Sequence, residues 1–339
     1  MRYSAFRFIM ILLLFVVSRG ASGQPSVPAD DSALTVQEQS PAVGEEAAVS
    51  TSLADTRLIP RQELLTDLTL DNFFSAGWND DFAMRSRATG TPDLTLLRVQ
   101  PNLLLRLARG NFFEETNLAS AAKKDLTDFD GFIDWSFNRR VMLEVNDAYQ
   151  WVDPRTGHPT ASGGAPGLLG RIQLVDTEPS SLCFNFKALA PNVPLGTTQT
   201  TLSYGLAGFQ DLAYWFNLDR VGLYYSFTFD TYAGPAANGA KNNDVQYCVS
   251  LAKTITGPDT PIFGKLSLFV ENFAQTDLDG SEAGRTLVTV TPGLRFNFGG
   301  KCDQIKMGSD NALIFGTDIP VSEYRPWAAI YRLSYIKFF

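Results

Sequence analysis

Residues 221–232 read "VGLYYSFTFDTY", and their side chains change character at every second position. The apolar positions are Leu223, Tyr225, Phe227 and Phe229. The polar positions between them are Ser226, Thr228 and Asp230. A period of two places alternate side chains on opposite faces of a β-strand. The stretch therefore predicts a strand with one apolar and one polar face.

The same alternation recurs in the second half of the chain. It is found in "DVQYCVSLAK" (residues 244–253), in "TLVTVTPGLRFNF" (286–298) and in the last residues, "YRLSYIKFF" (331–339). In "VMLEVNDAYQW" (141–151) Asp147 falls on the apolar side, so we expect a β-bulge to correct the register there.

Two all-β folds are compatible with this pattern. A secreted β-sandwich would bury the apolar face in a core, whereas a transmembrane barrel would turn that face toward lipid. The predicted strands run for about 10 to 16 residues, which exceeds the usual soluble strand and suits one that crosses a bilayer. Strand length and the many Phe and Tyr residues favour an all-β, closed antiparallel transmembrane β-barrel.

The strand number follows from counting back from Phe339. The predicted strands lie near 326–339, 308–320, 284–298, 262–277, 243–256, 218–232, 197–210, 182–192, 167–176, 140–153 and 127–137. If residues 96–117 form one long strand, the total is twelve. If that stretch splits at Arg109 and Gly110, a further strand from 73–88 gives fourteen. Both totals are even, as single-chain bacterial barrels require, and we favour twelve.

The N-terminal part predicts export. Arg2 and Arg7 precede an apolar run from Phe8 to Val17, and small residues allow cleavage between Gly23 and Gln24, so residues 1–23 read as a signal peptide. Residues 24–57 are acidic and read as a disordered linker. We expect a periplasmic segment over 58–92, forming a short helix or a plug, and the barrel over 93–339. No later stretch is apolar for long enough to be a membrane-spanning helix.

Continued alternation places a set of charged side chains on the inner face of such a barrel. The candidate lumen-lining residues are Arg98, Arg106, Asp134, Glu144, Arg171, Lys187, Asp230, Lys265, Glu271, Arg295, Asp318 and Arg332. These residues either form a charged pathway that sorts solutes or pair across strands and fill the interior, because buried charges are normally paired. The two signs are too nearly balanced to predict a preference for either.

The residues offer little support for catalysis or for a cofactor. His158 is the only histidine and lies between Gly157 and Pro159, so a His-dependent mechanism and a multi-His metal site are not expected. The sequence "TDLDGSEAG" (276–284) resembles a calcium loop but has its glycine in the wrong place. Three widely spaced cysteines, Cys183, Cys248 and Cys302, do not make a disulfide framework. We expect no enzyme activity, no cofactor, no metal and no nucleic-acid partner.

Four stretches carry a resemblance to a known family. They are "QTTLSYGLAGFQDL" (199–212), "RTLVTVTPGLRFNFG" (285–299), "ALIFGTDIPV" (312–321) and "YRLSYIKFF" (331–339). Together they resemble bacterial outer-membrane barrels grouped with MetA-type transporters of phenol-degradation operons, over about residues 94–339. The resemblance implies passive or gated transport of small solutes across the outer membrane. The alternative is a non-conducting structural or surface-anchoring barrel.

The terminal aromatic residue, Phe339, resembles the recognition signal of outer-membrane barrels. It implies that the barrel-assembly machinery recognises the last strand, and that outer-membrane lipids surround the folded protein. Lys337 departs from the pattern on the lipid-facing side, although a lysine near a strand end reaches the membrane interface with its long side chain.

Overall fold

The computed structural model describes residues 65–85, 91, 94–116, 125–153, 160–164, 166–191, 199–234, 241–257, 264–298 and 311–339. The predicted signal peptide and linker, His158 and Cys302 lie outside these residues, and so does the side chain of Lys265.

Strands dominate the described chain. They are β1 (Arg106–Thr116), β2 (Asp125–Ser136), β3 (Val141–Asp153), β4 (Thr160–Gly163), β5 (Gly167–Asp176), β6 (Ser180–Leu189), β7 (Thr200–Asp211), β8 (Val221–Ala233), β9 (Asn243–Thr254), β10 (Gly264–Asp277), β11 (Thr286–Phe298), β12 (Asn311–Pro320) and β13 (Ala329–Phe338). One short helix, α2 (Leu212–Phe216), joins β7 to β8. No helix in the described residues is long and apolar enough to cross a membrane.

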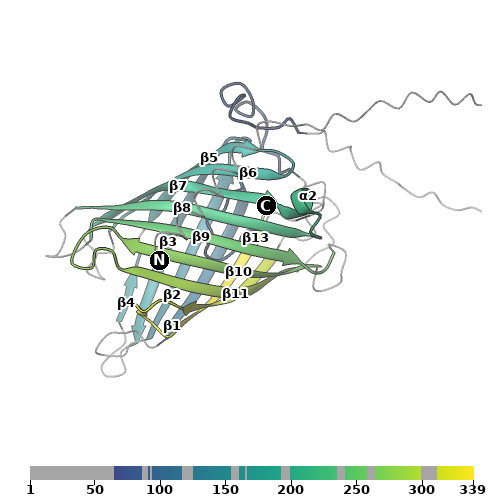
Figure 1. The fold of residues 1–339 in the computed structure, drawn as a ribbon. Coiled ribbons are helices and arrows are strands. Elements are labelled where there is room, and N and C mark those ends of the chain that lie inside the picture. The colour runs from purple at the N-terminus through teal and green to yellow at the C-terminus, as the bar shows by residue number, and fades with distance from the viewer. Residues whose placement is uncertain are drawn as a thin grey trace, which may run out of the picture. The chain divides into compact units, whose positions relative to one another are not determined.

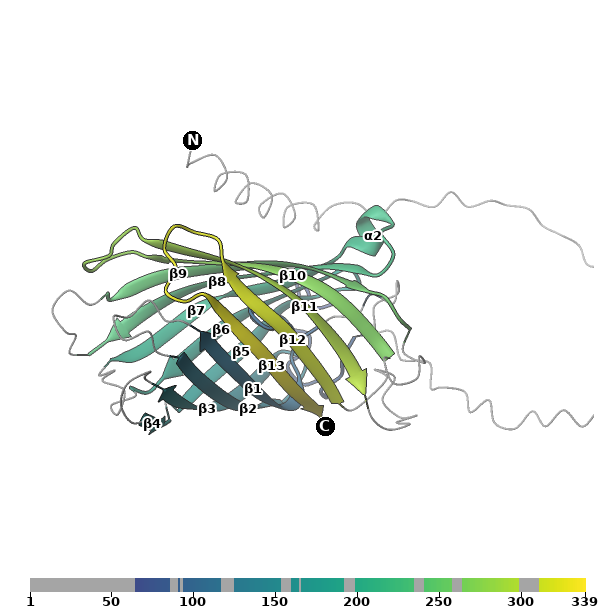
Figure 2. The ribbon, with the colours of Figure 1, turned by 90° about the horizontal axis from the view of Figure 1, so that it is seen from below.

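The strands form a closed ring in which every neighbouring pair is antiparallel. Consecutive strands pair along the chain, and β1 pairs with β13 to close the ring, with Leu107 opposite Phe338. Figure 2 shows β1, in blue, beside β13, in yellow. The short strand β4 pairs only with β3 and continues the line of β5. The ring therefore has twelve strands, and the predicted twelve-stranded antiparallel barrel is confirmed (Figure 1).

The two ends of the barrel differ in what they carry. Because the strand number is even, β1 begins and β13 finishes at the same end, which we call the terminal end. The helix α2 and the β2–β3 and β5–β6 turns lie at this end. The opposite end, which we call the loop end, holds the β8–β9, β10–β11 and β12–β13 connections.

The outer face is apolar and the inner face is polar along most strands, as the alternation predicts. On β8, Phe227 is 46% exposed on the outside, whereas Ser226 and Asp230 are buried on the inside. On β13, Tyr331, Leu333 and Tyr335 face outward, and Arg332 and Ser334 face inward.

The irregularity near Asp147 lies in the neighbouring strand. The pairing of β3 with β2 runs without a shift from Asp125 opposite Asp153 to Ser136 opposite Met142, so the expected bulge in β3 is wrong. Asp147 is exposed on the outer face, and its Oδ1 accepts a hydrogen bond from the amide of Ala148 at 2.9 Å. It lies where β5 stops and β4 takes over as the partner of β3.

The stretch 96–117, predicted as one strand, divides at Arg106. Residues 94–105 leave the wall and fold into the barrel interior, and we call them the lumen segment. In β1 the odd-numbered residues, such as Leu107 and Arg109, face inward. Among the described residues of 58–92, positions 71–75 form a turn and no helix is present.

The hydrophobic core lies inside the ring toward the terminal end. Leu96 and Leu105 of the lumen segment pack with inward-facing side chains of the wall, such as Leu107, Met142 and Ile336. Each of these three wall residues lies close to the terminal end of its strand. The hydrophobic core thus lies at the terminal end, where inward-facing charges such as Asp134 and Arg171 stand beside it, and further charged side chains line the loop end.

The alternation predicts opposite effects for two adjacent arginine substitutions. Phe227→Arg should cost about 2–4 kcal/mol of folding free energy in a bilayer, because it turns a charge toward lipid. Thr228→Arg should be tolerated, because that side chain faces the polar interior. Urea titration of the protein folded into lipid vesicles measures both costs. Similar costs for the two variants would contradict the assignment of faces.

Candidate functional site

The lumen segment is held by a buried carboxylate on the barrel wall. Glu271 of β10 has no solvent exposure. Its two oxygens accept hydrogen bonds from three consecutive backbone amides, those of Leu97 (3.2 Å), Arg98 (3.0 Å) and Val99 (2.9 Å). Hydrogen bonds to an ionised acceptor are about twice as strong as neutral ones. Glu271 therefore fixes the backbone of this turn, and it forms no ion pair within 4.0 Å with the described side chains.

A second contact joins the lumen segment to β12 and β13. Arg332 donates to Asp318 from Nε at 2.8 Å and from Nη2 at 2.7 Å, and Thr291 Oγ1 donates to the other carboxylate oxygen at 2.6 Å. Arg98 of the lumen segment approaches the same carboxylate at 3.5 Å and lies 3.8 Å from the centre of the Phe273 ring. Opposite charges predicted from the sequence thus pair inside the barrel.

Further polar contacts follow the lumen segment across the interior. They are Arg295 Nη1 to the Thr95 carbonyl (3.0 Å), the Gln100 amide to Ser226 Oγ (3.2 Å), Asn102 Nδ2 to Ser181 Oγ (2.6 Å), Arg171 Nη1 to the Leu103 carbonyl (2.8 Å) and Ser136 Oγ to the Leu105 carbonyl (2.7 Å). These partners belong to β11, β8, β6, β5 and β2. The segment therefore bridges wall strands on several sides, and the side chains of Arg171, Glu271 and Asp318 around it have no solvent exposure.

Residues 65–85, which we call the N-terminal arm, dock on the turns at the terminal end. Arg140 in the β2–β3 turn is fully buried, and its guanidinium donates to the carbonyls of Ala76 (2.8 Å) and Gln173 (2.9 Å) and to Asn72 Oδ1 (3.0 Å). Leu68 exchanges two backbone hydrogen bonds with Asp176, of 3.0 and 2.8 Å. Arg140 therefore joins the arm to the barrel.

A network of carboxylates connects two strand connections at the loop end. Asp244 accepts hydrogen bonds from Tyr232 (2.7 Å), Lys241 (2.6 Å) and Gln275 (2.8 Å), and Lys241 also reaches Asp277 at 2.9 Å. Partial burial acts to lower the pKa of Lys241, but its hydrogen bonds to Asp244 and Asp277 outweigh that effect and raise the pKa above its ordinary value. The ammonium group therefore stays charged between the two carboxylates.

The structure places the twelve candidate residues in four situations. On the inner face of the wall are Asp134, Glu144, Arg171, Lys187, Asp230, Glu271, Arg295, Asp318 and Arg332. Arg98 reaches the interior from the lumen segment. Arg106 lies on the outer face, where its guanidinium is 4.8 Å from the ring centres of Phe82 and Trp135. The side chain of Lys265 lies outside the described residues.

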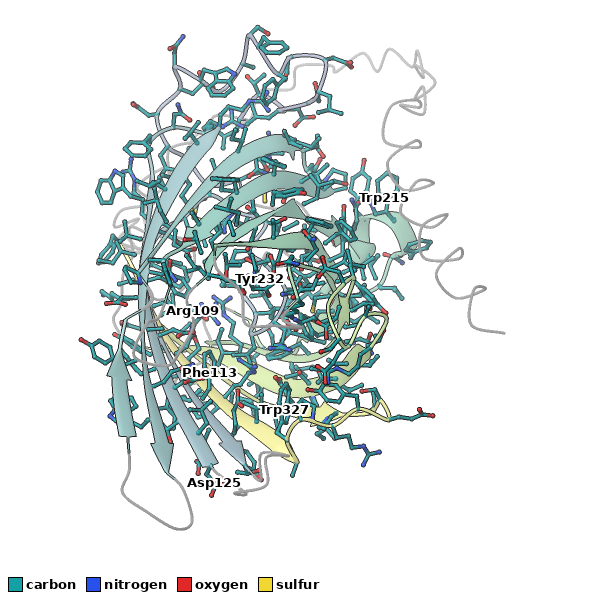
Figure 3. The ribbon with its side chains drawn as sticks, turned by 90° about the vertical axis from the view of Figure 1, so that its left-hand side faces the viewer. Arg109, Phe113, Asp125, Trp215, Tyr232 and Trp327 are labelled. Atoms are coloured by element: carbon teal, nitrogen blue, oxygen red, sulfur yellow. The ribbon has the colours of Figure 1, made fainter. Side chains whose placement is uncertain are left out.

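Several inward-facing charges were absent from the sequence-based set. Arg109 and Glu115 were missed because the wall begins at Arg106 and the assumed register of β1 was shifted by one residue. Asp128, Asp130, Asp244 and Asp277 follow the alternation of β2, β9 and β10, so the sequence carried a signal for them. Figure 3 shows Arg109 and Tyr232 projecting into the interior, whereas Trp215 lies on α2 outside the ring.

The described cysteines and acidic groups also bear on whether the chain holds a metal site. Cys183 and Cys248 are both buried, and Cys183 Sγ lies 3.6 Å from the carbonyl of Pro101 in the lumen segment. Within the described ranges, no group of three or more His, Cys, Asp or Glu residues is placed to hold a metal ion.

The chain was compared with protein families, curated proteins and solved structures. No family model matches it, and no curated protein matches it. Among solved structures, an outer membrane channel from Pseudomonas putida F1 matches with a TM-score of 0.51 at 11% identity, over 70% of this chain and 96% of that one. The NanC porin matches with a TM-score of 0.45 at 6% identity, over 69% of this chain and 99% of that one. The β domain of the Bordetella autotransporter BrkA matches with a TM-score of 0.41 at 12% identity, over 69% and 100%.

At these identities only the fold is shared. The first match supports the fold assignment reached above from the strand pairing: a closed antiparallel barrel.

The contacts of Arg140 predict that it holds the N-terminal arm in place. Arg140→Ala should release the arm, because hydrogen bonds from a charged donor contribute about 1.5–3 kcal/mol each and their buried acceptors would lose them. Limited trypsin digestion followed by mass spectrometry should then cut at Arg85 much faster than in the wild type. The barrel itself should remain resistant. An unchanged cleavage rate at Arg85 would mean that other contacts hold the arm without Arg140, namely the Leu68 backbone pair and Arg139, whose Nη2 donates to the Thr66 carbonyl at 2.8 Å.

Proposed function

We propose that the protein is an outer-membrane barrel that passes small solutes through its lumen when the lumen segment moves. The observation that carries this proposal is the nature of the barrier. It consists of a non-strand segment attached to a closed wall by hydrogen bonds and ion pairs, and charged side chains line the lumen on its loop side. The segment also packs leucine side chains in the core, but none of its contacts with the described wall is a strand pairing, so it can leave without opening a strand pair.

The apolar outer face supports a membrane location. A closed ring pairs every wall strand with two neighbours, as the absence of water in a bilayer requires, and the outward side chains are apolar. We infer export through cleavage near Gly23 and Gln24, assembly by the barrel-assembly machinery through the strand ending at Phe339, and residence in the outer membrane of a two-membrane bacterium. The terminal end would then face the periplasm. The resemblance to MetA-type transporter barrels agrees with this inference.

A second candidate function has its own support. The filled lumen at the terminal end also suits a non-conducting structural or surface-anchoring barrel, since fully satisfied buried polar networks rigidify a core. The proposal assigns no catalysis and no cofactor in either case. The two functions differ in whether the lumen segment can be displaced.

Tethering the lumen segment to the wall tests the transport proposal. The native Cys183 lies next to the carbonyl of Pro101, so Pro101→Cys should allow a disulfide between the segment and β6. The variant is made with Cys248→Ala and Cys302→Ala and recorded in planar bilayers. We expect ion conductance under reducing conditions and a fall to the bilayer baseline after oxidation, with recovery on reduction.

The matched control is the same protein with Cys183→Ala, in which oxidation should change nothing. A Glu271→Gln variant, with an uncharged acceptor for the three amides, should raise the fraction of time spent open. A protein that stays silent when reduced, and also with Glu271→Gln, would contradict transport and leave the structural barrel.

A further inference from the structure

The loop-side half of the lumen carries an excess of acidic side chains. Glu115, Asp128, Asp130 and Asp230 face inward there, and we call them the acidic vestibule. None of the four forms an ion pair within 4.0 Å with any described residue. Asp128 and Asp130 lie on the same face of β2, and Glu115 lies diagonally across on β1. Their charges therefore add in one region of the interior.

Other charges at this level largely cancel one another. Asp318 pairs with Arg332, and Asp277 pairs with Lys241 and Arg285. Among the described inward-facing residues at or next to this level, Lys187 and Arg109 are cations without an ion pair, against the four acids of the vestibule. The lumen field on the loop side is therefore negative.

One member of the vestibule carries an unsatisfied oxygen away from solvent. Asp230 is 5% exposed and lies on the inner face of β8 directly opposite Asp244, itself a carboxylate. Its Oδ2 accepts a hydrogen bond from Gln246 at 2.6 Å, whereas its Oδ1 has no hydrogen-bond partner. Asp128 Oδ1 is likewise buried and without a hydrogen-bond partner. A buried carboxylate stays ionised when a positive charge pairs with it, so a cation beside these oxygens would supply the missing partner.

We propose that the lumen prefers cationic solutes: small inorganic cations or organic ammonium ions, admitted from the loop end. The proposal rests on the proposed function and gives its solutes a chemical class. Acidic side chains lining a pore select cations at short range. A cleft of one sign with low-dielectric walls also raises the local concentration of counter-ions by about 10- to 1000-fold.

The test measures the vestibule potential without requiring conductance. Thr228→Cys places a thiol on the inner face of β8, two residues from Asp230, in a protein with Cys183, Cys248 and Cys302 changed to alanine. The folded protein in detergent is treated with the cationic reagent MTSET or the anionic reagent MTSES, and the modified fraction is followed by mass spectrometry. Each rate is divided by the rate of the same reagent with free 2-mercaptoethanol.

We expect the normalised MTSET rate to exceed the MTSES rate by at least about tenfold. Asp128→Asn combined with Asp130→Asn should bring the ratio toward one. The matched control Lys187→Gln, which removes the opposing cation at the same level, should raise it. Heat-modifiable mobility on gels verifies that each variant is folded.

Equal rates, a faster MTSES reaction or no reaction with either reagent would overturn the cation preference. Bilayer recordings of the same protein separate this outcome from failure of the proposed function. Conductance together with a rate ratio of one would support the transport proposal and contradict the cation preference. A large ratio in a protein that never conducts would leave an acidic vestibule on a structural barrel.

Discussion

The pairing of β1 with β13 is the constraint on which the remaining structure depends. Ten residue pairs, from Leu107 opposite Phe338 to Thr116 opposite Ala329, join the first wall strand to the last. Without this pairing the sheet would have two open edges, and in lipid each unpaired backbone group costs several kcal/mol. The closure also fixes the register of all the remaining strands, because a slip of one residue would reverse which side chains face outward.

Closure of a ring of this size encloses space that the wall side chains alone do not fill, and the lumen segment occupies part of it. A ring of about eight strands is filled by its own side chains, and larger rings leave space inside. Here the space toward the terminal end is occupied by residues 94–105, which supply Leu94, Leu96, Leu104 and Leu105 to the core. Their backbone has no strand partner, so its amides and carbonyls need other groups. Glu271, Arg295 and Arg171 provide them from the wall. Several inward charges are thus explained by the polar backbone of the segment they hold.

The difference between the barrel wall and the lumen segment explains which features the sequence predicts and which it does not. Period-two alternation depends on local side-chain order, so the strands, their number and their faces follow from residues such as Phe227 and Thr228. Local alternation fails for the lumen segment, because Leu103, Leu104 and Leu105 read as part of a wall strand but pack inside the ring. The alternation starts afresh at Arg106, which shifts the assignment of Arg106 and Arg109. The role of Arg140 has no signal in sequence, since its acceptors, among them Ala76, Gln173 and Leu174, come from distant parts of the chain.

A solute pathway needs a barrier that can move and a lining that selects its solutes. In this barrel the barrier lies near the terminal end and the acidic lining lies toward the loop end. Near the terminal end, polar groups are matched to the lumen segment, so their contribution depends on whether the segment is present. Toward the loop end, the acids of the vestibule form no hydrogen bond or ion pair with the lumen segment in the described part of the chain, so their positions on the wall do not depend on the segment. Displacement of the segment would leave Glu271, Arg171 and Arg295 without their present backbone partners and would take Arg98 away from Asp318. The groups uncovered near the terminal end would then carry both signs, so the acidic vestibule would still set the charge preference of the pathway.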